Sequence, residues 1–227
     1  MCSSDLAALR GLHCYEGHLH DGTLDARAHA ARPIYAELVA LARSLARPGE
    51  IITSGTPTFP IALAYGPLRD LEHTVSPGTV VYWDARSQQL GIAGFACAVT
   101  VQARVISAPN EDRITVDAGS KALDAAVGDP CAFAIGPWRL HALHPSEEHL
   151  PMRVETGPRP PLGTLIRLVP THVCPTVNLA DEAALIEGGT VQRVVAVKAR
   201  GHETLPTTES TVPKKPPAAR RAKTRSS

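Results

Sequence analysis

The stretch P-T-H-V-C-P-T-V-N-L, residues 170–179, places a histidine and a cysteine two positions apart between two prolines. Runs rich in aliphatic and β-branched residues flank it at 162–169 and 191–198, and both are predicted to be strands. If the stretch is extended, side chains i and i+2 share a face, so His172 and Cys174 would converge on one point. An imidazole and a thiolate suit a soft divalent cation such as zinc. The alternative is that Cys174 is a small buried hydrophobe.

The composition is that of a globular protein. The chain has 227 residues, of which 44% are hydrophobic and 4% aromatic. This length allows a sizeable core, and so few aromatics disfavour a stacking platform for nucleic acid. No apolar run is long enough to cross a bilayer, and the first residues lack the basic and apolar parts of a signal peptide. The five cysteines never form a C-x-x-C pair, which predicts reduced thiols and a cytoplasmic location.

The charges are unevenly distributed along the chain. Residues 213–227 hold six Lys and Arg and no acid, so within an overall charge of +1 the remaining chain is at −5. Because this end is rich in Pro and Ala and has no apolar periodicity, residues 204–227 are predicted to be a disordered basic tail. Such a tail could contact an acidic partner or nucleic acid. A solvated appendage is the favoured interpretation.

The first third of the chain has the order strand, helix, strand, loop. A short strand is expected within residues 6–22, residues 24–46 have apolar positions at helical spacing, and Ile51-Ile52 begins a second strand. This is the order of a βαβ unit. The loop that follows, Ser54-Gly55-Thr56-Pro57-Thr58, suits a phosphate because its backbone N–H groups can approach closely and its hydroxyls add donors. The alternative is a tight turn without a ligand.

Beyond this segment, turns and short β-like runs replace the helical periodicity. The predicted strands fall within residues 79–84, 97–107, 113–116, 162–169 and 191–199. This pattern predicts a small β-rich domain. The expected division of the chain is a βα segment over 1–75, a β domain over 76–203 and the tail over 204–227.

Six segments, in order, resemble one enzyme family, the D-threonine aldolases and D-serine dehydratases. They are Y-E-G-H at 15–18, S-G-T-P-T at 54–58, P-G-T-V-V-Y-W-D at 77–84, V-D-A-G-S-K-A at 116–122, E-E-H at 147–149 and P-T-H-V-C-P-T at 170–176. Enzymes of this family use pyridoxal 5′-phosphate and have the alanine-racemase fold type. The resemblance therefore implies a chain that is α/β plus all-β. It would comprise the C-terminal portion of a TIM-like (β/α) barrel, a small β domain with the metal site, and the basic tail.

The resemblance also assigns residues to the site. His172 and Cys174 match the family's metal ligands, which implies zinc with Mn²⁺ as the alternative. Asp117 to Lys121 match a β-domain signature that we interpret as structural, and Glu148-His149 match a loop near the metal. The cofactor-binding residues implied by the matching segments are Tyr15, His18, His20, Ser54, Gly55, Thr56, Gly78 and Thr79.

The family's Schiff-base lysine has no counterpart in this sequence. In the family it lies near the start of the barrel, and none of the fourteen residues before Tyr15 is a lysine. A (β/α) barrel takes about 200–250 residues, whereas residues 1–75 have room for two or three βα units. We therefore expect a truncated barrel and assign no catalytic residue. Its open strand edges predict poor solubility or oligomerisation, with a homodimer or the missing N-terminal barrel segment as the partner.

The function implied by the resemblance is a pyridoxal-phosphate- and metal-dependent lyase of β-hydroxy D-amino acids. The cofactor would serve as an electron sink and the metal as a Lewis acid at the β-hydroxyl. Dehydratase and aldolase both stay open because they use the same parts, with the H-x-C pair slightly favouring the dehydratase. One alternative is a non-catalytic remnant that retains metal or phosphate binding, which the missing lysine favours. The other is a basic-tailed interaction protein, which residues 213–227 alone support.

Overall fold

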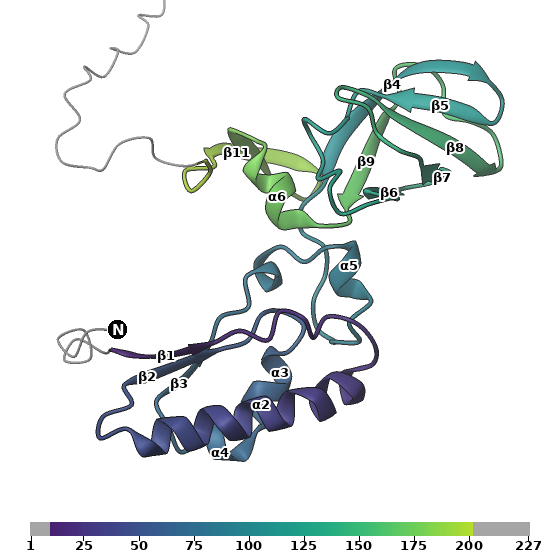
Figure 1. Ribbon diagram of the computed structural model, residues 1–227. Helices are drawn as coiled ribbons and strands as arrows, with labels where there is room; N and C mark the ends of the chain where they lie inside the picture. The colour runs from purple at the N-terminus through teal and green to yellow at the C-terminus, as the bar shows by residue number, and fades with distance from the viewer. Residues whose placement is uncertain (1–9, 202–227) are drawn as a thin grey trace, which may run out of the picture.

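The structure is a computed structural model, and it describes residues 10–201. A parallel sheet with its helices comes first, and a closed antiparallel barrel follows it (Figure 1). The basic tail lies outside the described residues. None of the helices in the described range has the length and hydropathy of a membrane-crossing segment.

The N-terminal part is a three-stranded parallel sheet in the order β1-β2-β3, connected by helices. Its elements are β1 (Gly11–Cys14), α2 (Leu24–Ser44), β2 (Glu50–Thr53), α3 (Phe59–Ala64), α4 (Gly66–Arg69) and β3 (His73–Val75). The predicted long helix is confirmed and ends two residues earlier than expected. It begins at Thr23, whose side chain accepts a hydrogen bond from the Ala26 N–H (3.2 Å) and so satisfies one free helix-end donor.

One face of α2 supplies the core of this part. The buried residues of α2 recur at three- and four-residue intervals, which places them on one stripe of the helix. They pack against Ile51 of β2 and against buried residues of α3 and α4. The buried stripe consists of Ala31, Tyr35, Leu38, Val39 and Ala42.

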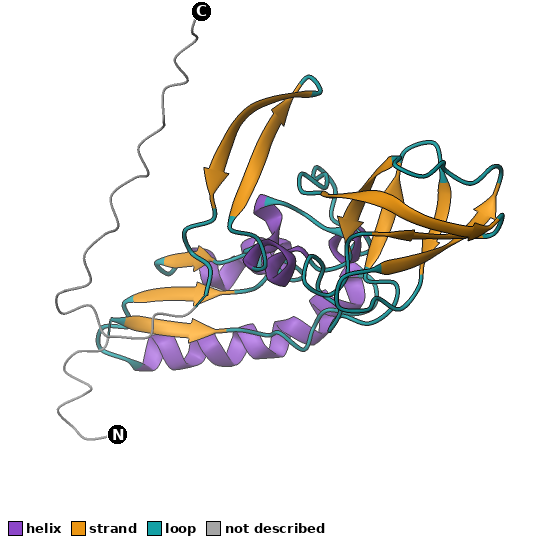
Figure 2. Cartoon of the chain, turned by 90° about the horizontal axis from the view of Figure 1, so that it is seen from above, coloured by secondary structure: helices purple, strands orange, loops and turns teal. Residues whose placement is uncertain are grey.

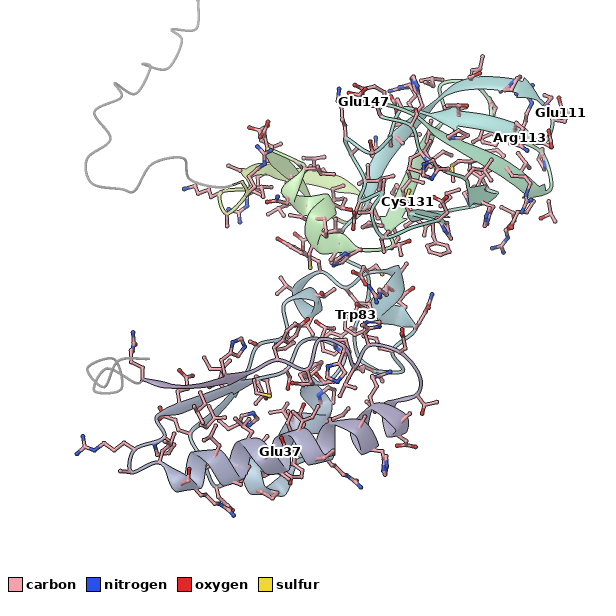
Figure 3. The ribbon with its side chains drawn as sticks, viewed as in Figure 1. Glu37, Trp83, Glu111, Arg113, Cys131 and Glu147 are labelled. Carbon is pink, nitrogen blue, oxygen red and sulfur yellow. The ribbon has the colours of Figure 1, made fainter. Side chains whose placement is uncertain are left out.

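The connection to the barrel differs from the prediction. A strand was expected within residues 79–84, but Thr79–Val81 forms a single 3₁₀ turn (η1) and Ala85–Gln88 forms the short helix α5. The Asp84 side chain starts α5 by accepting a hydrogen bond from the Ser87 N–H at 2.7 Å. Trp83 is 2% exposed and stacks on Phe95 with ring centroids 4.6 Å apart. Figure 3 shows Trp83 near α5, where the sheet part meets the barrel.

The barrel is closed and antiparallel, with strand order β4-β5-β8-β7-β6-β9 (Figure 2). Inward-facing residues alternate along each strand, as in Ile114 and Val116 or Leu150 and Met152, and all four are fully buried. The prediction for 113–116 is confirmed to the residue. The strands are β4 (Val101–Asn110), β5 (Arg113–Val116), β6 (Ala132–Ile135), β7 (Arg139–Ala142), β8 (Leu150–Thr156) and β9 (Leu165–Pro170).

A helix and a hairpin follow β9. Helix α6 (Val173–Asn178) comes directly after the barrel, and β10 (Glu182–Glu187) pairs with β11 (Thr190–Ala196) as a separate antiparallel hairpin. The strand expected near 191–199 therefore exists, but it lies outside the barrel. Its apolar side chains are solvent-exposed, among them Ile186, Val191 and Val194.

The parallel sheet is open within the described residues. Strands β1 and β3 are its two edges, each paired on one side with β2 alone. Residues 10–201 thus do not form a TIM-like barrel.

Candidate functional site

The loops after β2 and β3 meet helix α6 at Thr79. The Thr79 N–H donates to Thr56 Oγ1 (3.1 Å), and Thr79 Oγ1 lies 3.4 Å from Cys174 Sγ. Thr56 and Thr79 belong to the two predicted phosphate segments, and Cys174 belongs to the predicted metal pair. The structure therefore joins two predicted cofactor residues, Thr56 and Thr79, to one residue of the predicted metal pair, Cys174.

Ser54 shapes the loop after β2 instead of offering it free donors. It has φ 70°, a left-handed conformation that a non-glycine residue adopts at a cost of about 1–3 kcal/mol. Its N–H donates to the Cys14 carbonyl (3.4 Å), and its hydroxyl lies 2.9 Å from Thr53 Oγ1 and 3.3 Å from the Tyr35 hydroxyl. With every donor already paired, Ser54 holds the loop in place.

The next two residues have unused backbone donors. In the part of the chain that the structure describes, the N–H groups of Gly55 and Thr56 donate no hydrogen bond, although both residues are buried. Open N–H groups in a loop without acidic residues are what a phosphate oxygen requires. The loop therefore fits the phosphate of pyridoxal phosphate.

Tyr15 lies against this loop. A Cβ atom at Gly55 would lie 2.8 Å from Tyr15 Cε2, and one at Gly17 would lie 2.5 Å from Cε1, so both positions need glycine while the ring stays in place. The Tyr15 ring is 65% exposed and offers a flat aromatic face beside the open N–H groups. This arrangement fits the stacking of a planar ring.

The other predicted cofactor residues make fewer contacts with the rest of the site. Gly78 and His18 are exposed, and His20 is half-buried with Nδ1 2.9 Å from Asp21 Oδ1, although the pair lacks hydrogen-bond geometry. Within residues 10–201 neither histidine hydrogen-bonds to the loop after β2. Their role stays a prediction.

The extended-strand argument for His172 and Cys174 is wrong. His172 is the last residue with extended backbone (φ −130°, ψ 111°), and Cys174 lies in the first turn of α6. Pro175 explains the difference, because proline is tolerated in the first turn, where its missing N–H is not needed. The pair thus lies at a strand-to-helix corner.

His172 is oriented by a carboxylate that the sequence did not reveal. Its Nδ1 lies 3.2 Å from Oδ2 of Asp124, whose side chain is only 9% exposed. The Asp124 N–H in turn donates to Thr176 Oγ1 (3.1 Å), which donates to the His172 carbonyl (2.9 Å). Metal-binding histidines commonly use one ring nitrogen for the metal and the other for such a carboxylate. With Nδ1 engaged, Nε2 is left for a ligand.

The donors fit a soft cation with open coordination positions. Cys174 is exposed and His172 is partly exposed, so both can be reached from solvent. Across residues 10–201 no three His, Cys, Asp or Glu side chains cluster into a complete metal cage. An imidazole and a thiolate would leave the remaining positions to water or substrate, as in catalytic zinc sites.

Asp84 joins the segment that carries these donors to the connection after β3. It is 1% exposed, and its Oδ2 accepts from the Val173 N–H (3.0 Å) while Oδ1 accepts from Ser87. The Arg86 N–H donates to the Thr171 carbonyl (3.2 Å) beside it. Asp84 is the last residue of the quoted P-G-T-V-V-Y-W-D segment, and this motif is the sequence signal that could have pointed to it.

Lys121 does not have the properties of a Schiff-base lysine. Its exposed ammonium lies 2.8 Å from Glu147 Oε1 and 2.7 Å from Glu148 Oε1. These carboxylates raise the pKa of Lys121, which keeps the amine protonated and non-nucleophilic. These ion pairs are consistent with a structural role for the segment from Asp117 to Lys121.

The sequence is similar to those of known proteins over most of its length. The profile of the "Putative serine dehydratase domain" family matches residues 98–186. D-threonine aldolase of Arthrobacter sp. is 32% identical over 200 residues, which cover 84% of this chain and 51% of that enzyme. An uncharacterized protein of Mycobacterium tuberculosis is 38% identical over 132 residues, 52% of this chain and 96% of the relative.

A solved structure shares the architecture. The crystal structure of D-threonine aldolase from Filomicrobium marinum superposes with a TM-score of 0.73 at 30% identity, covering 84% of this chain and 53% of that one. The chain therefore spans about half the length of either aldolase.

Proposed function

Because this chain belongs to the D-threonine aldolase and D-serine dehydratase family, of the alanine-racemase fold type, we propose that it forms the C-terminal part of a pyridoxal-phosphate- and metal-dependent lyase. Its substrates would be β-hydroxy D-amino acids. The contact that joins the phosphate-type loops to Cys174 through Thr79 carries this proposal. The division into residues 1–75, 76–203 and 204–227 and the cytoplasmic location belong to the same proposal.

The loop after β2 would hold the cofactor. The N–H groups of Gly55 and Thr56 and the hydroxyl of Thr79 would bind its phosphate. Tyr15, His18, His20 and Gly78 would contact the rest of the cofactor. Ser54 keeps the loop in its left-handed conformation. The bound cofactor supplies an electron sink for a carbanion at Cα.

His172 Nε2 and Cys174 Sγ would hold the metal, which we propose is zinc, with Mn²⁺ as the alternative. The metal supplies a Lewis acid for the β-hydroxyl of the substrate. Asp124 fixes the ring of His172. Both dehydration and aldol cleavage are compatible with these residues, so the proposal covers the lyase class and not one of the two reactions.

The remaining barrel strands and the Schiff-base lysine would come from another polypeptide segment. Three parallel strands lie in residues 10–201, and the two lysines in this range are Lys121, which is ion-paired, and Lys198. The same observation favours the second candidate function, a non-catalytic remnant that retains metal or phosphate binding. A homodimer is the alternative source of the missing barrel surface.

Borohydride reduction separates these functions. The chain is incubated with pyridoxal phosphate and reduced, and any adduct is located by peptide mass spectrometry. We expect specific cofactor binding without a stoichiometric lysine adduct, since the lysine lies elsewhere. An adduct on Lys198 or on a tail lysine would show that this chain supplies its own Schiff-base lysine. Absence of cofactor binding would contradict the proposal and would leave a remnant that retains at most metal binding.

A further inference from the structure

Glu16 is a buried carboxylate with one unused oxygen. It lies two residues after β1, and it is 2% exposed. Its Oε1 accepts a hydrogen bond from the Tyr35 hydroxyl at 2.5 Å. Its Oε2 is buried and has no hydrogen-bond partner among the described residues. Buried polar atoms in folded proteins are nearly always paired, so an orphaned carboxylate oxygen indicates a missing partner.

Nothing described in this chain neutralises Glu16. Burial and the hydrogen bond to Glu16 raise the pKa of Tyr35, so the phenol stays a neutral donor. The buried guanidinium of Arg27 is occupied by three backbone carbonyls, those of Gly22, Pro57 and Leu90. Among residues 10–201 no Lys or Arg forms an ion pair with Glu16. A buried carboxylate with one neutral donor is destabilising until a cation pairs with it.

The position of Glu16 indicates where that cation comes from. Strand β1 is an edge of the parallel sheet, paired with β2 on one side and open on the other within the described range. A further parallel strand added to this edge would run beside β1 and end next to the turn that holds Glu16. Glu16 thus follows the strand that forms this open edge, two residues beyond its end.

We propose that Glu16 is the buried counter-charge for a lysine or arginine side chain on the strand that pairs with the open edge of β1. The inference rests on the proposed function, because that function requires further barrel strands. It adds the chemistry of the contact: the completing strand brings a cationic side chain to a preformed carboxylate. The Tyr35 hydrogen bond holds this carboxylate in place before the strand arrives.

Small cations can substitute for the missing side chain in a test on this chain alone. Thermal unfolding is followed in ethylammonium chloride, which mimics lysine, and in methylguanidinium chloride, which mimics arginine, against sodium chloride at equal ionic strength. We expect one of the two organic cations to raise the unfolding midpoint of the wild-type chain with a saturable concentration dependence. Glu16→Gln should abolish the effect. Glu37→Gln, which alters an exposed carboxylate of α2 (Figure 3), should retain it.

Two results would overturn the inference: no saturable shift in the wild type, or an equal shift in Glu16→Gln. If Glu16→Gln fails to fold, Tyr35→Phe replaces it, because it keeps the carboxylate, removes its single donor and should strengthen the cation effect. Zinc and pyridoxal phosphate binding are measured on the same samples. If the chain binds zinc and pyridoxal phosphate but shows no cation effect, the counter-charge inference fails and the lyase proposal stands. If it shows the cation effect but binds neither zinc nor pyridoxal phosphate, the lyase proposal fails and the counter-charge inference stands.

Discussion

At the scale of single residues, the account depends on pairs that lie far apart in the sequence. Asp124 meets His172, Glu16 meets Tyr35, and Thr79 meets Cys174. In the first two pairs, a residue of a predicted motif meets one that no local pattern singles out, whereas the third pair joins two predicted motifs. The functional chemistry therefore depends on side chains that only the fold brings together.

Asp124→Ala should weaken zinc binding although both metal donors remain. Without the carboxylate at Nδ1 the imidazole loses its fixed orientation, and loss of such a partner costs about 10- to 100-fold in metal affinity. Asp124→Asn, which keeps an acceptor oxygen, should lose less. The measurement is competition for zinc with a chromophoric chelator. Asp112→Ala, at an exposed turn, is the matched control, and an equal loss there or no loss in Asp124→Ala would contradict the role of Asp124.

At the scale of elements, two short helices are started by one side chain. Asp84 accepts the N–H of Ser87 in α5 and the N–H of Val173 in α6, so one buried carboxylate ties the link after β3 to the end of the barrel. Neither helix is long enough to be stable alone. Their positions, and with them the position of Cys174, depend on this residue.

Asp84→Ala should destabilise the fold by about 2–4 kcal/mol, since it leaves two buried N–H groups without an acceptor. Urea unfolding measures the loss. Asp25→Ala, at an exposed position in the first turn of α2, should change the free energy of unfolding by less than about 0.5 kcal/mol. Equal effects for the two variants would show that Asp84 does not join the two parts.

The helices and strands with regular apolar spacing could be predicted from the sequence, but the short helical turns at the site could not. Helix α2 and strand β5 follow from apolar spacing and β-branched composition, which act locally. A strand was expected within residues 79–84, and the argument for the metal pair took residues 170–179 to be extended. Instead, the first segment forms a 3₁₀ turn followed by the buried Trp83, and the second forms α6 with Pro175 in its first turn. Asp84 accepts the N–H groups of Ser87 in α5 and Val173 in α6. Tertiary contacts overrode local propensity at the residues that form the site.

At the scale of the whole molecule, apolar and strand-edge surfaces are left uncovered within residues 10–201. The parallel sheet has two open edges, and the β10–β11 hairpin exposes Ile186 and Val194 at 59% and 58%. Exposed edges and apolar patches of this kind promote association. The described part of the chain thus leaves strand edges and apolar side chains available for association.

The isolated chain should therefore self-associate as its concentration rises. Ile186→Lys combined with Val194→Lys should shift size-exclusion profiles toward the monomer, because charges on a hairpin oppose edge pairing. Leu41→Lys, at an exposed apolar position of α2, is the control and should leave the profile unchanged. A sharp monomeric peak for the wild type across the concentration range would rule out this expectation.

Protection of the Cys174 thiol by zinc tests the proposed site most directly. Cys174 is exposed, whereas burial raises the pKa of Cys131 to about 11, so an alkylating reagent should label Cys174 first and spare Cys131. We predict that one equivalent of zinc, but not of magnesium, blocks labelling of Cys174 in peptide mass spectra, and that His172→Ala removes the block. Labelling of Cys174 at the same rate with and without zinc, or equal protection in His172→Ala, would contradict a metal site formed by these two residues.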